Sequence, residues 1–164
     1  MSERARYALA CAAAILWIAS FFLPAVKTGH GWEMGYAVAA MGWAGPLIGQ
    51  FGWYANLIMI PGLGVLALGN PASSFDEMSK LGVALFLFWV NTLFWTDLQF
   101  DSGRRPILAY GSGYYAWMAA VLIGWLGLYI VARRGRPAED RAQLESGINN
   151  SVEDRERAMR ELEP

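Results

Sequence analysis

Residues 114–132 read YYAWMAAVLIGWLGLYIVA and contain no charged side chain. At a rise of 1.5 Å per residue, a helix of about 20 residues covers the roughly 30 Å hydrocarbon core of a bilayer. Small residues recur at every fourth position, Ala116, Ala120 and Gly124, so that they share one helix face and allow a second helix to approach closely. The stretch therefore predicts a membrane-spanning, closely packed helix over 113–132.

Three further apolar stretches predict helices of the same kind. Residues 7–26 and 51–69 carry no charge, and 81–100 carries none before Asp97. Asn91 falls near the middle of the third stretch, where a polar side chain usually bonds to a neighbouring helix. Together the four spans predict an all-α fold, an integral membrane four-helix bundle.

The region before the second span is uncharged but is interrupted by glycine and proline. We interpret 36–50 as an extra short helix, interfacial or partly re-entrant. Irregular backbone at that depth must be covered by protein or face water, because lipid cannot satisfy its amides. A five-span alternative, in which 36–69 forms two separate helices, is ranked second.

Composition supports a membrane protein and excludes several function classes. Hydrophobic residues make up 55% and charged residues 16% of the chain, against about 25% charged residues in soluble domains. A net charge of −1 gives no basic field for nucleic acid, so no nucleic-acid partner is expected. Because Cys11 and His30 are the only residues of their types, neither a disulfide nor a zinc site is expected, and no cofactor is predicted.

The chain divides into a transmembrane domain over 1–136 and a polar tail over 137–164. The tail is rich in Glu, Asp and Arg, and we expect it to be cytoplasmic and partly helical or disordered. Basic residues near the spans set the orientation. The proposed inner side holds Arg4, Arg6, Lys80, Arg133, Arg134 and Arg136, and the outer side holds Lys27, Arg104 and Arg105. The excess predicts that both termini are cytoplasmic, in a membrane of the bacterial inner-membrane type.

Polar and aromatic residues gather in the two predicted outer loops, which meet over one end of the bundle. The candidates for a ligand site there are His30, Glu33, Asp97, Asp101, Arg104, Arg105, Tyr110 and Tyr114. One interpretation is a site for a lipid headgroup or a periplasmic ligand, with the arginines on an anion and the aromatic rings as walls. The simpler interpretation, solvated loops held by ordinary ion pairs, is favoured.

The sequence lacks the motifs of common catalytic sites. It has no HExxH metal motif, no phosphate-binding glycine loop followed by Lys and Ser or Thr, and no GxSxG elbow. We therefore expect a non-enzymatic accessory or scaffold subunit that associates with other membrane subunits, or with itself, through small-residue helix faces. The alternatives are a small homo-oligomeric channel or transporter, lined by Asn56 and Asn91, and a lipid-handling enzyme that uses the outer cluster.

Overall fold

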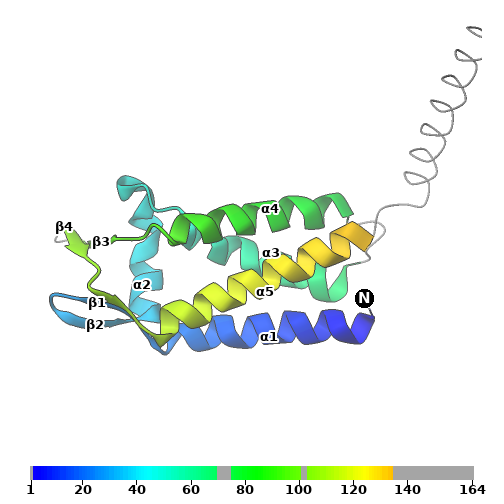
Figure 1. Ribbon diagram of the computed structural model, residues 1–164, viewed down its shortest axis with the longest axis horizontal. Coiled ribbons are helices and arrows are strands. Elements are labelled where there is room, and N and C mark those ends of the chain that lie inside the picture. The colour runs from blue at the N-terminus through cyan, green and yellow to red at the C-terminus, as the bar shows by residue number, and fades with distance from the viewer. Residues whose placement is uncertain (1, 70–74, 101–102, 135–164) are drawn as a thin grey trace, which may run out of the picture.

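Long helices lie side by side and short strands gather at one end of them, while the N-terminus lies at the opposite end (Figure 1). This arrangement is that of a computed structural model, which describes residues 2–69, 75–100 and 103–134. The predicted tail over 137–164 and the candidate Asp101 lie outside the described residues.

Four helices form what we call the helical body. They are α1 (Glu3–Phe21), α3 (Ala55–Leu68), α4 (Phe75–Thr92) and α5 (Ser112–Arg134). Helix α5 contacts the other three, and α3 also contacts α1 and α4. The predominantly helical character expected from the sequence is confirmed. Two of these helices, α1 and α5, are long and apolar enough to cross a membrane.

Small residues let α5 lie close to its neighbours. Ala120 is fully buried, and a Cβ added to Gly124 would lie 3.2 Å from Met59 Sδ on α3. Ala116, at the next position of the same stripe, is half-buried. On α1, Ala13 is fully buried in the same core. The small-residue stripe of α5 is thus occupied by contacts within the chain.

The strands form what we call the cap, together with the short helices described next. The strands are β1 (Pro24–Thr28), β2 (Gly31–Met34), β3 (Asp97–Phe100), β4 (Gly103–Pro106) and β5 (Ala109–Tyr110). One sheet has the order β2-β1-β5 and the other pairs β3 with β4, all antiparallel. Val26 of β1 pairs with Tyr110 of β5 and is fully buried.

The cap corrects two predicted helix ends. The helix expected over 7–26 ends instead at Phe21, and the one expected over 81–100 ends at Thr92. In both places the polypeptide continues into a strand. Pro24 has no backbone N–H to donate to a helix, so α1 ends before it. Strand pairing then satisfies the backbone groups that a longer helix would have satisfied internally.

A short helix is present before the second long one, as expected for 36–50. It consists of α2 (Gly35–Met41) followed by the 3-10 helix η1 (Gly42–Ile48), and a further 3-10 turn, η2 (Gly52–Tyr54), leads into α3. Helix α2 lies across the end of the helical body, beside the cap strands (Figure 1). A Cβ on Gly42 would lie 2.0 Å from Trp53 Cδ1, so only glycine fits where the start of η1 meets the Trp53 ring.

At the end opposite the cap, a buried arginine ties two helices together. Arg6 of α1 is 7% exposed, and its Nη1 donates a hydrogen bond of 2.8 Å to the backbone oxygen of Gly69. Gly69 is the C-terminal cap of α3, whose last carbonyls have no partner within the helix. The guanidinium therefore neutralises the negative end of α3 and fixes α1 beside it.

We predict that Ala13→Leu destabilises the protein by about 1–3 kcal/mol, because the extra carbons overfill the contact of α1 with the core. Thermal unfolding in detergent measures the loss. The neighbouring Ala12 is exposed, so Ala12→Leu is the matched control and should change stability by less than about 0.5 kcal/mol. Equal effects of the two changes would contradict this packing.

We further predict that Arg6→Met lowers stability by about 1.5–3 kcal/mol, since the carbonyl of Gly69 loses a charged donor. Methionine keeps the apolar stem of the side chain. Arg4 is exposed on the same helix, so Arg4→Met serves as the control and should leave stability nearly unchanged. The same unfolding assay applies, and an Arg4→Met loss as large as that of Arg6→Met would argue for a general charge effect.

Candidate functional site

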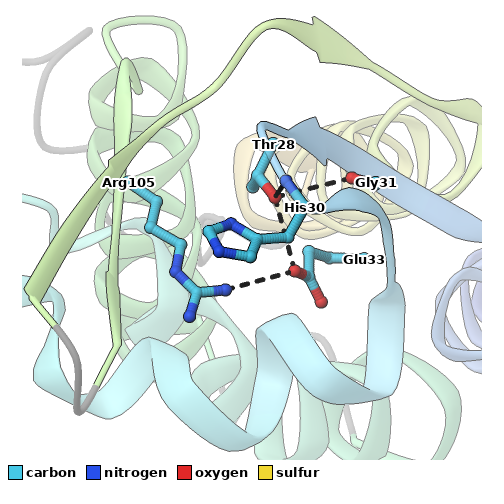
Figure 2. Close-up of polar contacts among 5 residues, drawn as sticks. All are labelled: Thr28, His30, Gly31, Glu33 and Arg105. Atoms are coloured by element: carbon cyan, nitrogen blue, oxygen red, sulfur yellow. Dashed lines mark hydrogen bonds and ion pairs between the residues drawn. The ribbon is translucent and has the colours of Figure 1, made fainter.

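An ion pair joins the two hairpins of the cap. Arg105 Nη1 on β4 lies 3.8 Å from Glu33 Oε1 on β2, and the two side chains are 25% and 22% exposed. The same carboxylate oxygen accepts a hydrogen bond of 3.4 Å from Thr28 Oγ1 on β1 (Figure 2). The predicted cluster thus brings Glu33 and Arg105 together, and the carboxylate already balances the guanidinium charge.

His30 lies at the turn between β1 and β2. Its backbone N–H donates to Thr28 Oγ1 at 3.2 Å, and its side chain is exposed. Figure 2 shows its imidazole ring next to the Arg105–Glu33 pair. Three of the predicted site residues therefore meet at one place on the cap, as the convergence of the two loops suggested.

The other charged candidates, Arg104 and Asp97, are not part of the Arg105–Glu33 ion pair. Arg104 is exposed where Arg105 is half-buried, since neighbouring residues of a strand point to opposite faces. The two arginines therefore do not form one anion clamp. Asp97, on β3, accepts a hydrogen bond of 3.0 Å from the adjacent Thr96 Oγ1. These contacts resemble the ordinary structural use of surface charges more than a ligand site.

The two candidate tyrosines tie β5 and α5 to the last residue of α4 and to the loop that follows it. Tyr110 donates its hydroxyl to the backbone oxygen of Trp95, and Tyr114 donates to that of Thr92 at 3.1 Å. Their ring centroids are 4.3 Å apart. Burial raises the pKa of Tyr110, and the nearby Tyr115 raises it further. Both hydroxyls are committed to backbone acceptors.

Asn91 holds the irregular segment between η1 and η2. Its Oδ1 accepts from the backbone N–H groups of Phe51 at 2.7 Å and Gly52 at 3.0 Å, and its Nδ2 donates to the oxygen of Gly49 at 3.3 Å. The expected mid-span position is wrong, because α4 ends at Thr92, one residue later. Asn91 therefore replaces the hydrogen bonds that a regular helix would have made.

Sequence reasoning missed the role of Asn56, which was considered only as a pore-lining residue. Its Oδ1 accepts two hydrogen bonds of 2.8 Å, from the indole Nε1 of Trp17 on α1 and from that of Trp117 on α5. One amide thus joins three helices. The sequence signal was an asparagine in an apolar stretch, together with tryptophans in two other apolar stretches.

A partly open cavity of about 50 Å³ lies where the helical body meets the cap. It is lined by residues of α1, β1, α2, η2, α3 and α5 and of the loop after α4, among them Phe21, Val38, Trp53, Asn56, Trp95 and Trp117. Its walls are mainly apolar and aromatic. This composition suits a small apolar group.

Comparisons with known proteins give no relative for this chain. No model of a known protein family matches it, and neither a curated protein nor a solved structure shows a significant similarity. The geometry of the chain itself is therefore the basis for a functional proposal.

We predict that Asn91→Leu destabilises the protein by about 1–3 kcal/mol, because two backbone N–H groups lose their acceptor. Asn91→Asp keeps an acceptor oxygen and loses only the bond to Gly49, so its loss should be smaller. Thermal unfolding of both variants in detergent gives the comparison. If both variants unfold like the unaltered protein, the structural role assigned to Asn91 is incorrect.

Proposed function

We propose that this protein is an integral membrane protein with four transmembrane helices, which acts without catalysis as an accessory or scaffold subunit. The main observation in support of this proposal is the apolar outer surface of the helical body. Only 22% of the residues in the apolar stretch of α1 are buried within the protein. Large apolar side chains on all four helices are exposed, including Ile15, Ile18, Leu57, Ile60, Val83, Leu87, Leu122 and Leu126. Exposure on this scale suits lipid as the surrounding solvent.

Helices α3 and α4 are compatible with crossing the membrane beside α1 and α5. The apolar helix that includes η2 extends over Gly52–Leu68. In α4 the charged residues Asp76, Glu77 and Lys80 all fall near its start, and the rest of the helix is uncharged. At 18 residues α4 is about 27 Å long, and its uncharged part, 81–92, covers about 18 Å of the roughly 30 Å hydrocarbon core, so we place its charged first turns at the membrane interface.

Aromatic residues mark one membrane interface. Trp32, Tyr36, Trp43, Phe51 and Phe94 are all exposed and belong to the cap or to the segments that join it to the body. Such rings concentrate at the headgroup level of bilayers. Their position supports a cap at one membrane surface, and the basic residues Arg4 and Arg133 at the other end favour that end as the inner one.

The polar groups within the body support a packing role over a conducting or catalytic one. Arg6, Asn56 and Asn91 each bond to another helix or to a helix end, as described above. Thr92 Oγ1 donates to the oxygen of Phe88 at 2.8 Å within α4. Groups that serve a transport path would instead be presented to water or to an ion.

The outer face of α1 is the surface we propose for association with other subunits or with a second copy. Ala8 and Ala12 are exposed there one helical turn apart, whereas Ala10 and Ala13 face the core. Small residues at this spacing allow a neighbouring helix to approach closely. This face replaces the α5 stripe, which is occupied within the chain.

The membrane topology is tested with the native thiol. Cys11 is exposed on α1, so we predict that a membrane-impermeant maleimide fails to label it in intact membranes and labels it after detergent is added. In a Cys11→Ala background, His30→Cys should react only from the outer side and Arg4→Cys only from the inner side. The protein should also remain in membranes washed with alkaline carbonate. Release by carbonate, or labelling of Cys11 without detergent, would contradict the proposal.

The scaffold role is tested by purification from the native membrane in a gentle detergent, followed by mass measurement of the intact particle. We expect stoichiometric partner subunits or a defined oligomer. Ala12→Leu, which should preserve folding, is expected to reduce this association, and Leu57→Ala on another exposed surface is the control. A lone monomer that keeps its fold would overturn the scaffold role.

A further inference from the structure

The two indole bonds fix the orientation of the Asn56 amide. Because Oδ1 faces Trp17 and Trp117, the Nδ2 group must point away from them. Among the described residues, none accepts a hydrogen bond from this Nδ2, and the only fully buried side-chain atom left without a partner is Gln50 Oε1. The Asn56 N–H groups are therefore accessible from outside, and Asn56 lines the cavity.

Apart from the indole Nε1 of Trp95, the other polar side chains of the cavity wall are already engaged. Tyr114 donates to Thr92, Trp53 Nε1 donates to the oxygen of Ala39 at 2.6 Å, and Ser20 Oγ donates to the oxygen of Trp17 at 2.6 Å. The rest of the wall is aromatic or aliphatic. The cavity is thus largely apolar and includes a hydrogen-bond donor, Asn56 Nδ2, whose amide is held by two tryptophans. Its complement is an apolar group with one acceptor oxygen.

The position of the cavity indicates which acceptor reaches it. Its lining includes the last residues of α1, the first turns of α3 and α5, and α2, which is at the junction of body and cap. Exposed Tyr36 and Trp43 lie on the same segment, α2 and η1, and mark the membrane interface. Ester carbonyls of membrane lipids lie at this boundary between headgroups and hydrocarbon.

We propose that the cavity binds the ester segment of one acyl chain of a membrane lipid, with Asn56 Nδ2 donating to the ester carbonyl. The inference rests on the proposed insertion of the protein in the membrane. A volume of about 50 Å³ has room for about four water-sized groups, which fits a carbonyl and its adjoining methylenes. A bulky ring system would not enter. Bound in this way, the lipid would cover the junction between α1, α2 and α5.

The test is lipid binding to protein that has been stripped of lipid in detergent, measured by native mass spectrometry. The probes are diacyl phosphatidylcholine and its dialkyl ether analogue, which has the same headgroup and chain length but no carbonyl. We expect one saturable diacyl lipid per chain. The ether analogue should bind about three- to tenfold more weakly, as expected for the loss of one hydrogen bond.

Two matched variants locate the site. Ala39 lines the cavity and its neighbour Ala40 is exposed. Ala39→Leu should fill the cavity and reduce binding at least tenfold, whereas Ala40→Leu should bind like the unaltered protein. Asn56→Asp keeps the oxygen that both indoles need and removes the donor, so it should abolish the preference for the ester over the ether.

The outcomes separate this inference from the proposed function. Equal binding of the ester and ether lipids, unchanged binding in Ala39→Leu, or displacement of the lipid by a quinone or free fatty acid at lower concentration would each overturn the ester site. The protein would still be an integral membrane protein if it resisted carbonate extraction. Release by carbonate would overturn both proposals.

Discussion

Backbone amides and carbonyls that leave a helix near a bilayer need partners within the protein, because lipid supplies none. In the described part of this chain, three irregular places meet this requirement through a side chain or a strand. Arg6 caps the end of α3, Asn91 holds the turn before it, and β1 pairs with β5 where α1 and α5 approach the cap. The helices can therefore end where they do with partners for these backbone groups.

The long apolar stretches gave reliable information about the existence of helices and little about their ends at the cap. Hydropathy does not distinguish a helix from a strand in a short apolar run such as 22–26. The deciding contact is the pairing of Val26 with Tyr110, two residues that are far apart in the sequence. Strand pairing of this kind depends on how the helices pack against one another. No local pattern within 7–26 predicts that packing.

The candidate site was predictable to the extent that charge and loop position determine it. The meeting of His30, Glu33 and Arg105 follows from two loops placed over one end of the helices, and the simpler interpretation as an ion pair agrees with the observed contacts. The Asn56 junction was not predictable, because it depends on the rotation of α1, α3 and α5. The polar residue was visible in the sequence, but its two tryptophan partners were not.

The cavity follows from the same close packing that forms the junction of body and cap. A Cβ on Gly35 would lie 1.9 Å from the oxygen of Ser20, and one on Gly113 would lie 2.7 Å from that of Leu23. Both glycines are needed for α2 and α5 to approach the end of α1, and both line the cavity. Tryptophans bridge that space and fix Asn56 rather than closing it. The donor left open there is available to an acceptor from outside the chain.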